Sequence, residues 1–129
     1  MKKLLITGCN GMLGGNIASI LKGGYEIFGI DKGSQNGKDY KYFNIDITDH
    51  KKVKEVISSV NPDYIVHCAA LTNVDFCEEN YELAVKVNAL ATKNIVSNLA
   101  LATRLFTYLP IPFLMARKET IAKQMSLIL

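Results

Sequence analysis

The sequence predicts an α/β fold in which helices cover both faces of a doubly wound parallel sheet, with the sheet truncated after about four strands. Short continuous apolar runs, which suit strands buried on both faces, alternate along the chain with segments whose apolar residues recur at helical spacing. Such alternation calls for parallel strands joined by crossover helices. The length of 129 residues and the hydrophobic content of 49% limit the chain to one globular domain.

The first three elements are expected to be a strand, a helix and a strand. Residues 4–6 are a continuous apolar run followed closely by glycine, which predicts a buried strand. The next segment has apolar residues at helical spacing and meets the glycine pair 23–24, which is typical of a helix C-terminus. Residues 25–30 predict the second strand, which closes on Asp31.

The later elements continue this alternation. Residues 42–45 predict a short third strand, and Thr48 is a natural N-cap for the helix that follows. Residues 64–70 predict the fourth strand. A loop over residues 71–80 is then expected to lead into one long helix over residues 81–100.

Composition excludes several classes of function. The net charge of +3 is too small, and too evenly distributed, to predict a nucleic-acid surface. The three cysteines form no CxxC pair and the two histidines stand apart, so no metal site is expected. The N-terminal apolar run is too short for a signal peptide or a membrane span, which predicts a cytoplasmic protein with no membrane partner.

A glycine-rich turn is the clearest indication of function. In ITGCNGMLGG, Gly8, Gly11 and Gly14 stand at three-residue spacing between the first strand and the first helix. Gly8 permits a tight turn, Gly11 lets the backbone approach a pyrophosphate, and Gly14 lets the helix pack on the strand. Because a helix N-terminus offers N–H groups to phosphates, the pattern predicts a Rossmann-like dinucleotide site. The alternative is that the glycines serve only the turn.

Two carboxylates follow strands that should end at the same edge of the sheet. Asp31 is placed to accept hydrogen bonds from the adenosine ribose, which favours NAD over NADP, although Lys32 beside it weakens this preference. The alternative is an aspartate in a solvated loop. Asp46 could accept from the adenine amine while Ile47 packs on the ring, or Asp46 could cap the next helix instead.

The end of the fourth strand completes the predicted site. The small residues Ala69 and Ala70 leave room for a cofactor, because ligands of doubly wound sheets lie at the carboxyl ends of strands. Leu71, Thr72 and Asn73 are expected on the nicotinamide side of that cofactor.

Two polar residues stand in apolar surroundings. His67 lies inside an apolar strand, which favours a hydrogen-bonded core residue over a catalyst. Asn88 is expected either to hydrogen-bond the backbone of a neighbouring strand and hold the site in shape, or to be exposed on its helix.

Read together, the segments TGCNGMLG, NIDITD, PDYIVHCAALTNVDFCE and VNALATKNI resemble the dTDP-4-dehydrorhamnose reductase family, in the extended short-chain dehydrogenase/reductase superfamily. The resemblance covers residues 1 to about 104. It implies reduction of a 4-keto nucleotide sugar, dTDP-4-dehydro-rhamnose, with NADPH or NADH, and a homodimer in the full-length family. The predicted dinucleotide-binding residues are Gly8, Asn10, Gly11, Met12, Leu13, Gly14, Asp31, Asp46, Ile47, Ala69, Ala70, Leu71, Thr72 and Asn88.

The catalytic motifs of that family are not found in this chain. They comprise Ser-Thr-Asp at the end of the fifth strand and a later Tyr-x-x-x-Lys pair, whose lysine lowers the pKa of the proton-donating tyrosine. Position 112, four residues after Tyr108, is proline. No catalytic residue is therefore assigned, and residues 1–104 are interpreted as a half-domain followed by an aberrant tail, residues 105–129.

A shifted reading frame explains the tail. When each new codon takes the third base of one codon and the first two bases of the next, permitted codon choices convert LFTYLPIPFLMARKETIAKQMSL into VYISTDSVFDGKKGNYSETDEP. This restores STDSVFDG where the resemblance requires it. We therefore expect a frameshift near Leu105 and a truncated, inactive reductase. The rival interpretation is a native C-terminal helix over residues 117–129 of a short binding protein.

Truncation predicts an open edge on the fourth strand, marginal stability and aggregation, because the prolines at 110 and 112 disfavour pairing with that edge. Leu105 and Phe106 are expected to begin an apolar tail with no core in which to be buried.

Two other functions remain open. One is a nucleotide-sugar epimerase or dehydratase, which shares the glycine turn and the Asp-Ile motif. The other is a non-catalytic NAD(P)-binding regulatory module.

Overall fold

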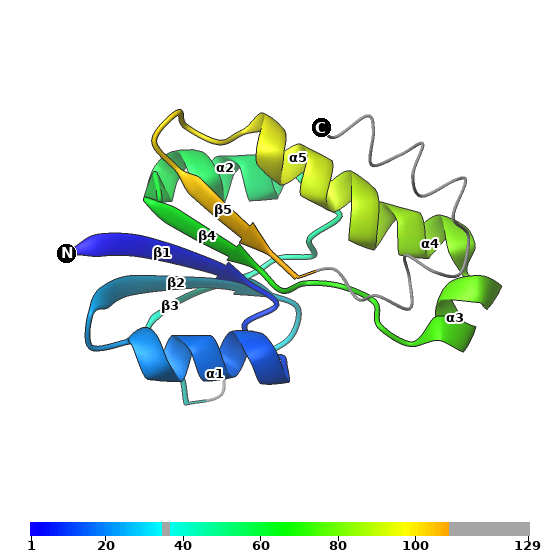
Figure 1. Ribbon diagram of the computed structural model, residues 1–129, viewed down its shortest axis with the longest axis horizontal. Coiled ribbons are helices and arrows are strands. Elements are labelled where there is room, and N and C mark those ends of the chain that lie inside the picture. Colours follow the sequence, from blue (N-terminus) through cyan, green and yellow to red (C-terminus); the bar gives the residue numbers. More distant parts are fainter. Residues whose placement is uncertain (35–36, 109–129) are drawn as a thin grey trace.

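The computed structural model describes residues 1–34 and 37–108, and this part contains a five-stranded sheet (Figure 1). Every strand pair is parallel, and the strand order is β3-β2-β1-β4-β5. The predicted doubly wound α/β class is therefore confirmed. The strands are β1 (Lys2–Thr7), β2 (Tyr25–Asp31), β3 (Lys41–Asn44), β4 (Tyr64–His67) and β5 (Arg104–Thr107).

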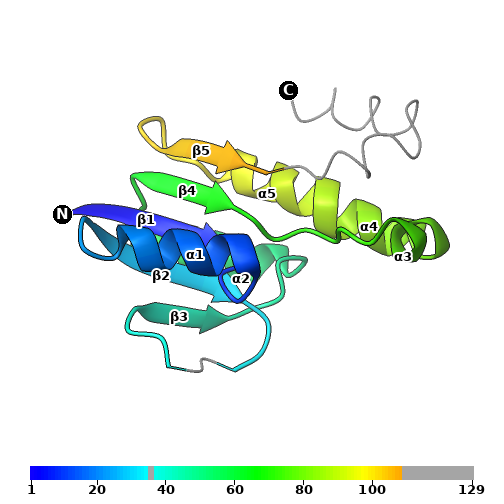
Figure 2. The same ribbon diagram turned by 60° about the horizontal axis from the view of Figure 1, so that its bottom comes forward.

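Helices cover both faces of the sheet. α1 lies on one face, and α2 and α5 lie on the other (Figures 1 and 2). Among the described helices, none has the length and apolar character that a membrane span requires. The helices are α1 (Met12–Leu21), α2 (His50–Val60), α3 (Val74–Glu79), α4 (Tyr81–Val85) and α5 (Ala91–Ser97), with a π-helical turn, η1 (Lys86–Leu90), between the last two.

The segment from residue 71 to residue 100 differs from the expected loop and single long helix. α3 forms inside the expected loop, because the side chain of Asn73 accepts a hydrogen bond from Phe76 N–H and caps the helix. The expected long helix is interrupted at η1, where Ala91 N–H bonds the carbonyl oxygen of Lys86, five residues back. Such π-helical turns are frequent at functional sites.

The sheet has an apolar core on each face. Leu5 belongs to the larger core, together with α2 residues and Ile95 of α5. Leu4 and Ile6 belong to the smaller core, together with Ala18 of α1. Because successive residues of a strand point to opposite faces, the continuous apolar run of β1 supplies both cores.

β5 corrects the expectation that β4 would have an open edge. Residues 104–107 pair with β4 in parallel, and Leu105 packs, half-buried, against the larger core. Phe106 remains 56% exposed, as expected for part of the tail. The pairing needs only four residues that can donate to the ladder, and these contain no proline. The prolines at 110 and 112, and the remaining tail to residue 129, lie outside the described residues.

Candidate functional site

A cavity of about 210 Å³ opens at the carboxyl ends of β1, β2 and β4. The chain order of the strands reverses between β1 and β4, and ligands of open α/β sheets bind at such a point. The predicted residues that line the cavity are Gly8, Gly11, Asp31, Asp46, Ile47, Ala69, Ala70 and Leu71. The structure thus brings together residues from four separate parts of the predicted site.

The glycine turn has the geometry that its spacing predicts. Gly8 has a φ of 71°, in the left-handed region that favours glycine, and a Cβ built there would lie 2.7 Å from Ala69 N. A Cβ on Gly14 would overlap the carbonyl oxygen of Gly8, so α1 packs directly on the turn. The turn is closed by a hydrogen bond from Gly11 N–H to Gly8 O at 3.0 Å. Backbone atoms therefore exclude a side chain at Gly8 and at Gly14.

The N-terminus of α1 differs from the N-termini of α2 and α3. No side chain in the described part caps α1 at Gly11, and its first turn holds no acidic residue. By contrast, Asp49 accepts a hydrogen bond at the start of α2, and Asn73 accepts one at the start of α3. The partial positive charge at the start of α1 is therefore not compensated by a side-chain cap, which suits an anionic group.

Asp31 holds the glycine turn against the end of β2. Its Oδ2 accepts a hydrogen bond from Asn10 N–H at 2.8 Å, and its Oδ1 accepts one from Lys32 N–H at 2.7 Å. The side chain is fixed at the edge of the cavity, which fits the predicted ribose contact better than a solvated loop residue. The contact with a ribose itself stays a prediction.

Tyr42 of β3 completes this corner, although the sequence analysis did not single it out. Its hydroxyl lies 3.0 Å from Asp31 O and 2.9 Å from Gly33 O, and it accepts a hydrogen bond from Asn10 Nδ2 at 3.1 Å. Asn10 Nδ2 also donates to Lys32 O at 2.9 Å. Desolvation raises the pKa of Tyr42 above its ordinary value of 10. No local pattern marks Tyr42, because its partners come from separate segments.

Asp46 lines the cavity and also stabilises the turn after β3. Its Oδ1 accepts hydrogen bonds from Thr48 N–H at 2.9 Å and from the Thr48 hydroxyl at 2.8 Å. The N–H of Thr48, then its hydroxyl and the ammonium of Lys32, lower the pKa of Asp46. Because Thr48 is engaged with Asp46, the N-cap of α2 is Asp49, and the expectation of Thr48 as N-cap is wrong. The adenine contact of Asp46 stays a prediction.

Asn88 holds the wall of the cavity that follows β4. It is 4% exposed, so the alternative of an exposed helix residue is wrong. Its Oδ1 accepts a hydrogen bond from Leu71 N–H at 2.8 Å, and its Nδ2 donates to Leu71 O at 3.0 Å. The expected backbone contact is therefore present, but its partner lies in the loop after β4 and not in a strand. Asn88 does not line the cavity itself, and its support of the site stays a prediction.

His67 is a hydrogen-bonded core residue, as its surroundings predict. It is 3% exposed, and its two ring nitrogens lie 2.6 Å from Thr7 Oγ1 and 2.9 Å from Thr92 Oγ1. Burial lowers the pKa of His67 to about 4, so the ring is neutral at physiological pH.

Several predicted residues do not line the cavity. Met12 and Leu13, at the start of α1, are 87% and 44% exposed, and Thr72 is exposed directly after Leu71. Asn10 is exposed and acts through its hydrogen bonds to the end of β2. Direct contacts of these residues with a dinucleotide stay predictions.

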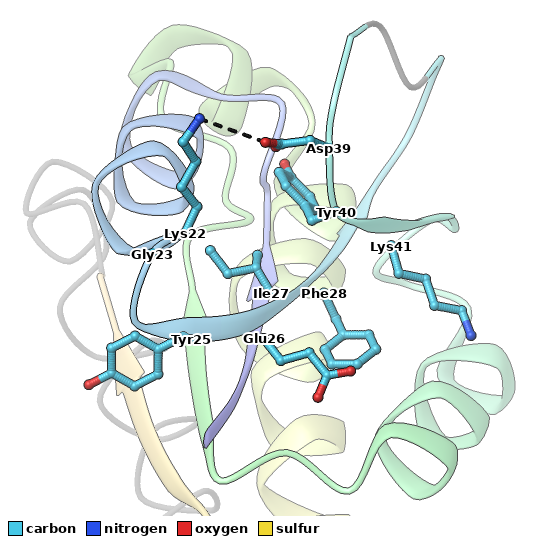
Figure 3. Close-up of a pocket in the computed structure, with 9 residues that line it drawn as sticks. All are labelled: Lys22, Gly23, Tyr25, Glu26, Ile27, Phe28, Asp39, Tyr40 and Lys41. Atoms are coloured by element: carbon cyan, nitrogen blue, oxygen red, sulfur yellow. Dashed lines mark ion pairs between the residues drawn. The ribbon is translucent and has the colours of Figure 1, made fainter. Parts of the chain in front are cut away.

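A second hollow, of about 570 Å³, lies at the amino end of β2 (Figure 3). Lys22 and Asp39 form an ion pair there, with a distance of 3.7 Å and side chains that are 61% and 72% exposed. This hollow is larger than the first, but it lies away from the carboxyl ends of the strands and from the glycine turn. We therefore assign the function to the smaller cavity.

Comparison with known proteins agrees with this assignment. Residues 1–109 match the family described as RmlD substrate binding domain. The chain belongs to this family. It is 33% identical over 93 residues to "Probable low-salt glycan biosynthesis reductase Agl14" of Haloferax volcanii, a match that covers 71% of this chain and 31% of the relative. It is 36% identical over 90 residues to dTDP-4-dehydrorhamnose reductase of Aggregatibacter actinomycetemcomitans, a match that covers 68% of this chain and 27% of the relative.

Solved structures support the same relationship. The crystal structure of a hypothetical dTDP-4-dehydrorhamnose reductase from Sulfolobus tokodaii is 30% identical, with a TM-score of 0.74, and covers 81% of this chain and 38% of that one. The resemblance to the N-terminal part of dTDP-4-dehydrorhamnose reductases is thus confirmed. The chain spans about a third or less of the length of the curated relatives described above.

Similar structures contain both kinds of nicotinamide dinucleotide. The dTDP-4-dehydrorhamnose reductase of Bacillus anthracis, in complex with NADP, is 30% identical with a TM-score of 0.66, and covers 81% of this chain and 35% of that one. The enzyme WbmH of Bordetella bronchiseptica, in complex with NAD+, is 28% identical with a TM-score of 0.64. This match covers 76% of this chain and 35% of that one. A nicotinamide dinucleotide is therefore the kind of ligand that these two similar structures share.

Two curated relatives have other functions by name. UDP-glucose 4-epimerase of Rickettsia rickettsii is 32% identical over 111 residues, covering 74% of this chain and 32% of the relative. Methionine adenosyltransferase 2 subunit beta of Xenopus tropicalis is 30% identical over 100 residues, covering 77% and 29%. The shared part of the fold therefore serves several functions.

Proposed function

We propose that this chain forms the dinucleotide-binding half of an NAD(P)H-dependent nucleotide-sugar reductase, whose complete form reduces dTDP-4-dehydro-rhamnose. The proposal rests on the start of α1, which has no side-chain cap and borders the cavity at Gly11. The glycine turn before it leaves no room for a side chain at Gly8 or Gly14. A pyrophosphate is the group that such a helix start and turn would bind.

Of the two dinucleotides, we propose that NADH binds more tightly. The backbone N–H groups next to Asp31 already have protein acceptors, because Asn10 and Lys32 donate to its carboxylate. The following Gly33 N–H donates to Asn44 Oδ1 at 3.1 Å. A ribose 2′-phosphate would therefore meet a carboxylate and find these donors occupied. Ribose hydroxyls can instead donate to the remaining lone pairs of Asp31.

We further propose that the 129-residue chain does not reduce the sugar. None of its six tyrosines is followed four residues later by a lysine, so the expected proton donor is missing. The proposed cause is the frameshift near Leu105, which places the domain boundary between residues 104 and 105. The pairing of β5 is compatible with this cause, because the shifted frame also has apolar residues, Val-Tyr-Ile, at positions 105–107. Sequencing the gene across these codons tests it: an intact frame with other tail codons would contradict the proposal.

Cofactor binding is tested by titrating the chain with NADH and with NADPH, using nicotinamide fluorescence. We expect saturable binding with a lower dissociation constant for NADH. Replacing Asp31 with serine should shift the preference toward NADPH, because it removes the carboxylate that would repel the 2′-phosphate. Asp39→Ser, at the exposed ion pair of the second hollow, is the matched control and should leave the preference unchanged. Failure of the unaltered chain to bind either dinucleotide would overturn the proposed function.

Turnover is tested separately with dTDP-4-dehydro-rhamnose and NADH. The chain should show only background oxidation of NADH, whereas a full-length, frame-corrected version should reduce the sugar. Measurable turnover by the 129-residue chain would contradict the missing proton donor.

The relatives favour two other candidates. An epimerase, suggested by the similarity to UDP-glucose 4-epimerase, would interconvert a sugar nucleotide with no net oxidation of cofactor in the frame-corrected protein. A regulatory subunit, suggested by the similarity to methionine adenosyltransferase 2 subunit beta, would bind dinucleotide without turnover even at full length.

A further inference from the structure

The described part of the chain contains four buried residues with polar side chains, Thr7, His67, Asn88 and Thr92. All four belong to one hydrogen-bonded network, although they come from β1, β4, η1 and α5. A buried polar group is costly unless it is paired, so a network of this kind is retained only where every member has a partner.

The directions of the hydrogen bonds follow from the acceptors at one end. The Thr92 hydroxyl donates to the carbonyl oxygen of Asn88 at 3.1 Å, so its oxygen must accept from His67 Nε2–H at 2.9 Å. A neutral ring with its proton on Nε2 has an unprotonated Nδ1, which accepts from the Thr7 hydroxyl at 2.6 Å. The oxygen of Thr7 in turn accepts from Ala69 N–H at 3.3 Å. Each hydroxyl and ring proton of this chain of hydrogen bonds is therefore assigned to one donor.

Both ends of the network hold the same short segment. Ala69 N–H is bound by Thr7, and two residues later Leu71 is bound through both N–H and C=O by the side chain of Asn88. The segment Ala69–Leu71, which we call the β4 wall, lines the same cavity as the glycine turn. The two are in close contact, because a Cβ added at Gly8 would lie 2.7 Å from Ala69 N. A shift of the β4 wall would therefore change the space in which the dinucleotide lies.

We propose that His67 and Thr92 are positioning residues of the dinucleotide site, which act through Thr7 and Asn88 to hold the β4 wall in its binding geometry. This inference rests on the proposed function, because the ligand is the nicotinamide dinucleotide. Neither residue lines the cavity, so neither is a catalytic or contact residue. Their effect on affinity is indirect and comes from preorganisation of the wall.

The test replaces Thr92 with valine, which has nearly the same shape but leaves His67 Nε2–H without an acceptor. The NADH dissociation constant should rise by about tenfold, since one buried hydrogen bond and the order it imposes on the wall are lost. Thr92→Ser keeps the hydroxyl and should bind NADH within about twofold of the unaltered chain. Ile95→Val, in the same helix and fully buried, is the matched packing control and should also remain within about twofold.

Amide hydrogen exchange gives a second readout that does not require ligand. Exchange of Ala69 and Leu71 N–H should be faster in Thr92→Val, but not in Thr92→Ser or Ile95→Val. If Thr92→Val and Ile95→Val behave alike in affinity and exchange, the positioning role is overturned. If the unaltered chain binds no dinucleotide, the proposed function falls, and unchanged exchange in Thr92→Val would then overturn the role of the network as well.

Discussion

The two walls of the cavity are built in different ways. The glycine-turn wall consists of backbone, and its shape depends on the absence of side chains at Gly8 and Gly14. The β4 wall, Ala69–Leu71, is shaped by side chains that lie behind it and do not line the cavity, in the network of Thr7, His67, Thr92 and Asn88. One wall is thus encoded locally, and the other depends on contacts between distant parts of the chain.

Because of this difference, the two walls are sensitive to different kinds of substitution. The glycine-turn wall tolerates no added atom, because the obstructing atoms are backbone and cannot rotate away. The β4 wall tolerates no lost hydrogen bond, because its supporting groups are buried away from water. The predictions below add an atom to the first wall, perturb the second, and finally change a helix start outside both.

The largest effect is expected from Gly14→Ala. The new Cβ would overlap Gly8 O, so α1 must move away from the turn, with a loss of about 3 kcal/mol of unfolding free energy and no detectable NADH binding. Gly24→Ala is the matched control, because a Cβ there meets nothing within 4 Å. Urea unfolding and NADH titration of both variants provide the measurement. Normal NADH binding by Gly14→Ala would contradict the close packing of α1 on the turn.

Lowering the pH should destabilise the β4 wall through His67. The folded pKa is about 4, below the ordinary value of 6.5, so as pH falls the unfolded chain takes up a proton before the folded chain does. The contribution of His67 to the unfolding free energy is fully present above pH 6.5. Up to about 3 kcal/mol of it should be lost between pH 6.5 and pH 4. The pKa of Asp46 is also lowered, from an ordinary value of 3.8. Its contribution to stability is therefore lost only as the pH falls below about 3.8. Urea unfolding across this range measures the effect.

A His67→Gln variant provides the control for the pH experiment. It has no imidazole to titrate, so its unfolding free energy should depend much less on pH between 6.5 and 4.5. Equal slopes for the variant and the unaltered chain would show that other groups cause the dependence.

A smaller effect is expected from Asn88→Ala. Leu71 N–H loses its partner, and Leu71 O keeps only the weak thiol donor of Cys77 at 3.6 Å, which should lower the unfolding free energy by about 2 kcal/mol and weaken NADH binding. Asn94→Ala in α5 also removes an amide, but its bond to His50 O is exposed and its bond from Asn98 Nδ2 is only partly buried, so about 0.5 kcal/mol is expected. Similar losses in the two variants would mean that the β4 wall gains nothing special from Asn88.

The smallest effect is expected from Asp49→Ala, outside both walls. Removing the N-cap of α2 should cost about 1 kcal/mol of stability and leave the NADH dissociation constant unchanged. The contrast with α1 is the point of the experiment, because α2 has a side-chain cap whereas the N-terminus of α1 is proposed to receive a phosphate. Weaker NADH binding by Asp49→Ala would contradict the expectation that only the N-terminus of α1 contributes to dinucleotide binding.

Much of the glycine-turn wall could be predicted from the sequence. The spacing of Gly8, Gly11 and Gly14, the apolar run of β1 and the position of Asp31 at the end of β2 all depend on neighbouring residues and local backbone geometry. The parallel order of the sheet followed from the alternation of elements. By contrast, the sequence did not reveal Tyr42, α3, the π-helical turn or the pairing of β5 with β4, because each depends on partners far along the chain or on weak local preferences.

By itself the sequence determined the class of fold, the turn that is proposed to seat a pyrophosphate and the family resemblance, because local steric limits and hydrophobic periodicity suffice for these. Only the tertiary structure decided how the β4 wall is held. Thr7 and His67 are 60 residues apart in sequence, and His67 and Thr92 are 25 apart. Whether such groups meet depends on strand register and helix placement, which no single segment specifies.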